Sequence, residues 1–145
     1  MDWTGGKETG IGLRERKLYR AKLYLVGVNS VGMIAKTPEP PYYAVIFTSL
    51  RTSGDNGYAK MADRMIELAE KQPGYLGVES VRDNLGITIS YWKDEESIKA
   101  WKENLAHTLA RKKGRETWYN SFTVRVARVE RDYSFDISAD SSRKK

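Results

Sequence analysis

The chain has 145 residues, which is enough for one domain with tails and a hydrophobic core of ordinary size. It has no cysteine and only one histidine, so disulfides, thiolate metal sites and histidine-rich metal sites are excluded. The net charge is +6, but residues 41–135 hold fifteen basic and thirteen acidic residues. Because the basic excess lies mainly near the two ends, it does not indicate a groove that binds nucleic acid.

Both ends of the chain differ in composition from its middle. Residues 1–36 pass from a polar, glycine-rich start through a basic stretch to a short apolar run. That run is too short to span a membrane and too interrupted by glycine and polar residues for a secretory signal. We therefore predict an irregular N-terminal extension over residues 1–36, one domain over 37–135 and a disordered tail over 136–145. A cytoplasmic location without membrane attachment is expected.

The first two predicted elements are a strand and a helix. Residues 42–50, YYAVIFTSL, are rich in aromatic and β-branched side chains and predict a strand. The first six of them are all apolar, which indicates that both faces of this strand are covered. A helix is predicted after the turn cluster at residues 53–57, because the following apolar residues share one helical face: Tyr58, Met61, Ala62, Met65, Leu68 and Ala69.

The second half of the domain begins with a hairpin. Residues 76–83 and 86–92 predict two antiparallel strands joined by a tight turn. One long helix is then expected from the acidic residues 94–96 to Gly114, where acidic and basic ends suit the helix dipole. Its predicted apolar stripe is Ile98, Trp101, Leu105 and Leu109. Residues 115–120 predict a short turn or helical fragment, and residues 121–135 a long closing strand.

This order of elements, βαββαβ, predicts a ferredoxin-like α+β fold with two helices on one face of a four-stranded antiparallel sheet. The second face still carries apolar residues from strands 42–50 and 86–92, and soluble monomers rarely expose such a patch. Burying roughly 600 Å² of it would contribute about 15 kcal/mol before association costs. We therefore expect a homodimer whose two sheets pack face to face.

Several sequence blocks in this order resemble the antibiotic biosynthesis monooxygenase family. They are PEPPYYAVIFTS, GYAKMADRMIELA, QPGYLGVES, GITISYW, the segment from Trp101 to His107, GRETWY and VERDY. The resemblance covers residues 37–135 and implies a dimeric α+β barrel with a pocket between the sheet and the helices of each protomer. Some members oxidise aromatic, quinol-like molecules with O₂ and need no metal or flavin, whereas others bind and degrade haem through an Asn–Trp–His set.

The Asn–Trp–His set of the haem-degrading members has only a partial match in this sequence. The asparagine belongs on the first strand, and residues 42–51 contain none. Trp101 and His107 match the other two positions, but their separation is shorter than in that subgroup. On one continuous helix His107 would lie on the polar face, about 180° from Ile98. His107 is therefore interpreted either as a surface histidine or as a general base or axial ligand.

The remaining candidates are one arginine and several aromatic residues. Arg125 lies in the middle of an apolar strand, where it either stabilises an anionic substrate or pairs with a carboxylate such as Glu79. Tyr91, Trp101 and Trp118 are interpreted either as walls of a flat apolar pocket or as core residues. Ser49 and Arg51, at the end of the first strand, are candidate residues for the pocket mouth.

The family resemblance, together with the aromatic content of the domain, implies a small monooxygenase that oxidises an aromatic or quinone-like molecule with O₂, using neither flavin nor metal. His107 and Arg125 are the predicted catalytic residues, and Tyr91, Trp101 and Trp118 are the predicted substrate-binding residues. Two alternatives stay open: a haem-binding or haem-degrading protein, and a non-enzymatic dimeric barrel that binds a small aromatic or apolar ligand. No nucleic-acid or membrane partner is expected.

Overall fold

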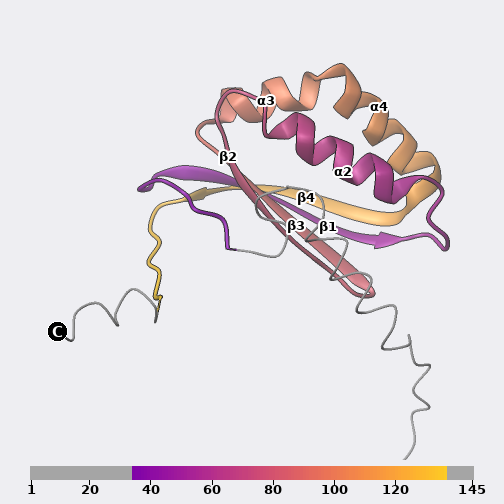
Figure 1. Ribbon diagram of the computed structural model, residues 1–145, viewed down its shortest axis with the longest axis horizontal. Coiled ribbons are helices and arrows are strands. Elements are labelled where there is room, and N and C mark those ends of the chain that lie inside the picture. The colour runs from indigo at the N-terminus through magenta and orange to yellow at the C-terminus, as the bar shows by residue number, and fades with distance from the viewer. Residues whose placement is uncertain (1–33, 137–145) are drawn as a thin grey trace, which may run out of the picture.

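The computed structural model describes residues 34–136 of the chain. Its four strands form one antiparallel sheet in the order β2-β3-β1-β4, and the helices all lie on one face of that sheet (Figure 1). The elements in chain order are β1 (Tyr42–Arg51), α2 (Tyr58–Ala69), β2 (Tyr75–Arg82), β3 (Leu85–Trp92), α3 (Glu95–Glu103), α4 (Leu105–Lys113), the π-helical turn η1 (Gly114–Trp118) and β4 (Tyr119–Val129). The predicted ferredoxin-like α+β fold is confirmed. Most of the predicted extension and tail, residues 1–33 and 137–145, lies outside the described residues.

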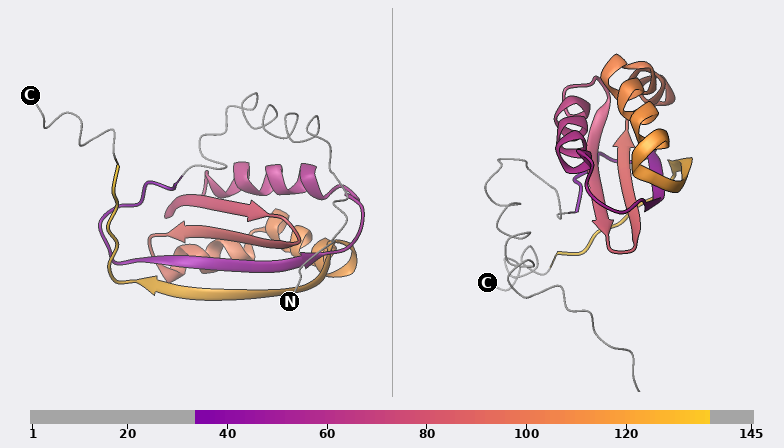
Figure 2. Two further views of the ribbon diagram at one scale, coloured as in Figure 1. Left: turned by 90° about the horizontal axis from the view of Figure 1, so that it is seen from below. Right: turned by 90° about the vertical axis from the view of Figure 1, so that its right-hand side faces the viewer.

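The sheet has a helix face and an open face, and alternation along the strands assigns each side chain to one of them. Trp92 marks the helix face, because its ring stacks on that of Trp101 in α3, with 6.3 Å between ring centroids. Trp92 is paired with Tyr43 in β1, so Tyr43 and every second residue after it also point toward the helices. The open face, seen from below in Figure 2 (left), holds the alternate set, which includes Ile46, Ile87, Ile89, Tyr91 and Arg125.

The core between the sheet and the helices is centred on Trp92, whose exposed fraction is 0%. Its indole Nε1 donates to the hydroxyl of Ser90 at 2.9 Å, and Tyr75 packs edge-on against its ring. At the other end of the helix face, Trp118 is also buried and donates from Nε1 to the carbonyl oxygen of Asn56 at 2.9 Å. Both buried indole donors are therefore satisfied, as expected for tryptophans in a core.

The long helix predicted from residue 94 to Gly114 is wrong, because the structure divides it into α3 and α4 at Asn104. The backbone of Asn104 is extended there, and its side-chain Oδ1 accepts hydrogen bonds from the amides of Ala106 and His107. An asparagine that caps a helix start in this way competes with continuation of the preceding helix. As a result Leu105 and Leu109, predicted on the apolar stripe, are 74% and 57% exposed.

The end of α4 also differs from the prediction. The sequence predicts a helix stop at Gly114, but the backbone of this residue stays helical and leads into η1. A side chain at Gly114 would crowd the ring of Tyr119, since an added Cβ would lie 2.9 Å from Cε2 of that ring. Glycine at this position therefore serves the packing of Tyr119 against the helix.

The closing strand is shorter than predicted, because β4 runs from Tyr119 to Val129 and does not reach residue 135. Its last paired residue, Val129, lies opposite Tyr42, the first residue of β1. Pro40 and Pro41 precede Tyr42, and proline has no amide hydrogen with which to extend the ladder. No helix among residues 34–136 is long and apolar enough to cross a membrane.

Candidate functional site

The five residues predicted to form the site do not meet in one place. Trp101 and His107 lie together on the helix side of the sheet, where their rings stack. Trp118 lies on the same side but at the other end, against Tyr58. Tyr91 and Arg125 belong to the open face. Within one chain, then, only Trp101 and His107 form a pair.

The pairing of Trp101 with His107 follows from the break at Asn104. The two rings are nearly parallel, with 10° between their planes and 4.5 Å between their centroids. Nδ1 of His107 also lies 2.8 Å from the carbonyl oxygen of Trp101. The break turns α4 relative to α3 and brings His107 back onto the end of α3. The polar-face placement holds for an unbent helix, and the bend at Asn104 removes that condition.

The hydrogen bond of His107 fixes its tautomer. A carbonyl oxygen can only accept, so Nδ1 carries the proton and Nε2 of the neutral ring keeps its lone pair. Burial lowers the pKa of His107 below that of a free imidazole, and the nearby Arg111 charge lowers it further, whereas the bond to Trp101 acts in the opposite direction. The imidazole is therefore neutral at neutral pH, with Nε2 as a basic nitrogen.

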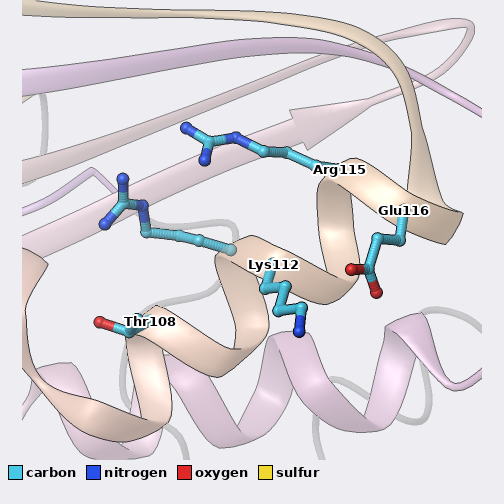
Figure 3. Close-up of a pocket in the computed structure, with 5 residues that line it drawn as sticks. Thr108, Lys112, Arg115 and Glu116 are labelled. Carbon is cyan, nitrogen blue, oxygen red and sulfur yellow. The ribbon is translucent and has the colours of Figure 1, made fainter.

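A hollow of about 300 Å³ runs along α4 and η1, and one of its lining residues, Arg111, lies near His107. We call it the α4 groove, and its lining residues are Thr108, Arg111, Lys112, Arg115 and Glu116. Figure 3 shows the side chains of Thr108 and Arg115 pointing to one side of the helix, while Lys112 and Glu116 point to another. Across residues 34–136, none of the three cationic residues in this groove forms an ion pair. With three cationic side chains and one carboxylate, that of Glu116, the groove has a net positive charge.

Arg115 connects the α4 groove to the helix face of β4. The guanidinium carbon of Arg115 lies 5.9 Å from the ring centroid of Phe122. Phe122, Val124 and Val126 all point to this face and remain 37%, 50% and 52% exposed. The basic groove thus adjoins an uncovered apolar surface, an arrangement that can hold a ligand with an apolar part and an anionic part.

Sequence reasoning misses Arg111 and Arg115 as site residues. The basic run at residues 111–113 is explained along the sequence as the favoured cationic end of a helix. A signal is nevertheless present, because Thr108, Arg111 and Arg115 are spaced so that they share one side of a continuing helix. The predicted stop at Gly114 conceals this spacing.

The structure separates Arg125 from Glu79, the carboxylate named above as its alternative partner. Arg125 is on the edge strand β4, whereas Glu79 is on β2, and β1 and β3 lie between these strands. The carboxylate of Glu79 instead accepts from the hydroxyl of Tyr91 at 3.1 Å and from the amide of Ala35 at 2.9 Å. Burial, followed by this bond to Glu79, raises the pKa of Tyr91 to about 12. Tyr91 is therefore a neutral hydrogen-bond donor on the open face.

The residues present do not fit the haem-degrading set. Strand β1, Tyr42–Arg51, contains no asparagine, and Trp101 covers one side of the His107 ring. Among residues 34–136, no group of three or more histidine, cysteine, aspartate or glutamate side chains is placed to hold a metal ion. The surroundings of His107 therefore do not reproduce the arrangement that haem-degrading members use.

The fold and the groove together define a small ferredoxin-like domain with a ligand-sized hollow beside the helix face of its sheet. The family model described as "Antibiotic biosynthesis monooxygenase" matches residues 41–113. The uncharacterised protein YqjZ of Bacillus subtilis is 53% identical over 104 residues, which cover 70% of this chain and 91% of YqjZ. The chain therefore belongs to the antibiotic biosynthesis monooxygenase family.

Solved structures agree in fold. One is SnoaB of Streptomyces nogalater, described as a cofactor-independent oxygenase, with a TM-score of 0.56, 10% identity, and coverage of 63% of this chain and 95% of SnoaB. Another is a conserved protein of Methanosarcina mazei, with a TM-score of 0.57, 13% identity, and coverage of 62% of this chain and 94% of that protein. At these identities the likeness concerns the fold.

Proposed function

We propose that this protein is a monooxygenase that oxidises an aromatic, quinol-like small molecule with O₂, without flavin or metal. The observation that carries the proposal is a neutral imidazole, that of His107, placed one helical turn before Arg111 on the same side of α4. Membership of the monooxygenase family and the description of SnoaB as a cofactor-independent oxygenase support the same reaction class.

The groove suits a phenol that reacts as its anion. Nε2 of His107 accepts the hydroxyl proton, and the guanidinium groups of Arg111 and Arg115 stabilise the phenolate. The apolar side chains Phe122 and Val124 provide a surface for the aromatic ring. In this assignment Arg111 and Arg115 take the electrostatic role predicted for Arg125, which lies on the other face of the sheet.

The reaction balances without an added reductant. The phenolate gives one electron to O₂, and the resulting substrate radical and superoxide combine to form a carbon–oxygen bond. The hydroperoxide then loses water as its O–O bond breaks, which leaves a quinone. One oxygen atom ends in the product and the other in water, and the substrate supplies all the electrons. The protein contributes proton transfer, charge stabilisation and orientation.

Oxygen uptake with a panel of phenols and quinols tests this proposal. We expect uptake with at least one compound, with quinone formed in equal amount. The Arg115→Gln variant should lower kcat/KM by about 10²-fold, because it removes a charge that stabilises the anion. The matched control is Lys113→Gln, which removes an exposed charge of α4 outside the groove. Ligand retention without turnover across the panel would contradict the enzymatic proposal and favour a binding protein.

We also propose that two copies of the chain pack through their open faces. Ile46, Ile87 and Ile89 lie side by side on this face in neighbouring strands. Val81 and Leu85, also on the open face, are 67% and 48% exposed. An apolar surface of this kind, on a sheet whose helices all cover the other face, favours a second sheet as its partner.

The oligomeric state is expected to respond to a charge on that face. Native mass spectrometry should give a dimer for the unmodified protein and a monomer for Ile87→Glu, because a carboxylate buried without a partner opposes association. Lys99→Glu, an exposed change on α3, is the control and should remain dimeric. A monomer for the unmodified protein at micromolar concentration would contradict the proposal.

A further inference from the structure

A cluster of two arginines and two tyrosines lies at the end of the helix face, beyond the α4 groove. Its centre is the ring of Tyr58, the first residue of α2. The guanidinium carbon of Arg51 lies 3.7 Å from the centroid of this ring, and that of Arg82 lies 5.8 Å from it. Tyr119 packs edge-on against Tyr58, with 6.0 Å between centroids. We call Arg51 and Arg82 the arginine pair.

The arginine pair has no negative charge to balance it within the part of the chain that the structure describes, because neither guanidinium forms an ion pair there. The carboxylate of Asp55 accepts hydrogen bonds from the amides of Gly57 and Ala59 and forms no ion pair with either arginine. Within residues 34–136, the hydrogen bonds that Arg51 donates go to the carbonyl oxygens of Gly54 and Asp55. Two like charges beside one ring repel each other, and an anion between or against them would offset this repulsion.

Unused hydrogen-bond donors point to the same conclusion. Nε of Arg51 is buried and has no acceptor, and no other buried side-chain nitrogen or oxygen of residues 34–136 lacks a partner. A buried donor of this kind needs an explanation, and an acceptor that is absent from the chain itself is one. Ser49, only 2% exposed, accepts from Arg82 Nη2 at 2.7 Å, which leaves its own hydroxyl hydrogen free to donate.

Tyr119 adds a protonated hydroxyl to the cluster. Burial, and then the charge interaction and hydrogen bond with Tyr58, raise the pKa of its hydroxyl well above the usual range, although the charges of Arg82 and Arg51 act in the opposite direction. The hydroxyl therefore stays protonated. Glycine at position 86 leaves the space for the second arginine, because a Cβ atom there would overlap the guanidinium of Arg82. The local sequence thus holds this charge in place next to Ser49.

We propose that Arg51, Arg82 and Ser49 form a binding site for a small anion, namely the carboxylate or phosphate group of a small molecule. Paired guanidinium groups recognise both anions through charge-assisted hydrogen bonds. Aromatic contacts connect this site to the α4 groove. The ring of Tyr119 contacts that of Phe122, and Phe122 lies beside Arg115. The site does not depend on the proposed oxidation, because it consists of different residues.

Calorimetric titration of the full chain with inorganic phosphate and, separately, with benzoate tests the proposal at constant ionic strength. We expect saturable binding of at least one anion: benzoate alone identifies a carboxylate site, and phosphate alone identifies a phosphate site. Arg51→Gln and Arg82→Gln should each weaken binding by about tenfold or more. Gly86→Ala should weaken it as well, because it displaces Arg82 and keeps the charge.

Arg64→Gln is the matched control, since Arg64 is an exposed arginine of α2 that pairs with Glu67. It should bind as the unmodified protein does. Circular dichroism establishes that each variant is folded before titration. If only one of Arg51→Gln and Arg82→Gln folds, that variant alone is compared with the unmodified protein. Absence of saturable binding for both anions would overturn the proposal. Equal affinity in the unmodified protein and in a folded Arg82→Gln or Arg51→Gln variant would overturn it as well.

Discussion

Replacing Trp92 by alanine is expected to lower the free energy of unfolding by about 3–5 kcal/mol, because it leaves a large cavity in the centre of the core. Trp92 is 0% exposed, and its ring contacts Tyr75 from β2 and Trp101 from α3. Its loss therefore loosens the contact between the sheet and the helix layer. Urea denaturation, followed by circular dichroism at a fixed protein concentration, measures the change.

Trp92→Phe is the matched control for this prediction. It keeps an aromatic ring in the core but loses the hydrogen bond from Nε1 to Ser90, so we expect a smaller loss of roughly 1–2 kcal/mol. Protein concentration must be kept constant, because association of two chains adds to the apparent stability. A loss below about 1 kcal/mol for Trp92→Ala would show that this ring does not hold the two layers together.

His107→Ala is expected to lower kcat/KM for oxygen uptake by about 10²–10⁴-fold, the usual contribution of a general base. The effect should depend on pH in one direction. Because burial holds the pKa of His107 below 6.5, the unmodified protein should keep its activity near neutral pH and lose it as acid protonates Nε2. The variant should lack this fall. Initial rates measured across the pH range provide the test.

Trp101→Phe is the control for His107→Ala, because it retains a ring against the imidazole and leaves the carbonyl bond to Nδ1 in place. We expect it to preserve the acid limb of the pH profile. A full acid limb in His107→Ala would assign the base to another group.

The same lowered pKa of His107 affects stability, because between that pKa and 6.5 the unfolded chain binds more protons than the folded one. The free energy of unfolding of the unmodified protein should therefore decrease as the pH is lowered through this window.

Local sequence patterns determined most of the fold. The apolar spacing of α2, the aromatic and β-branched strand β1 and the β2–β3 hairpin all lie where periodicity predicts them, within a residue or two. These patterns are local, because they express which side of each element must be buried. The βαββαβ order then leaves few ways to assemble one sheet with helices on one face. The alternation of β3, with Ile87 and Ile89 opposite Trp92, also follows from the sequence pattern.

The site was much less predictable, because it depends on how elements meet. A single residue, Asn104, caps α4 and turns His107 from a predicted polar face onto Trp101, which helix periodicity could not show. Strand order decided that Arg125 lies far from Glu79 and on the opposite face from His107.

The sequence by itself thus determined the elements, their order and the family resemblance, because burial patterns repeat along the chain at fixed periods. Only the tertiary structure brought Arg51 and Arg82, thirty-one positions apart, to the same tyrosine ring, and set Arg115 beside Phe122. Such meetings arise from strand register and helix packing, and these are properties of the whole domain that no single segment encodes.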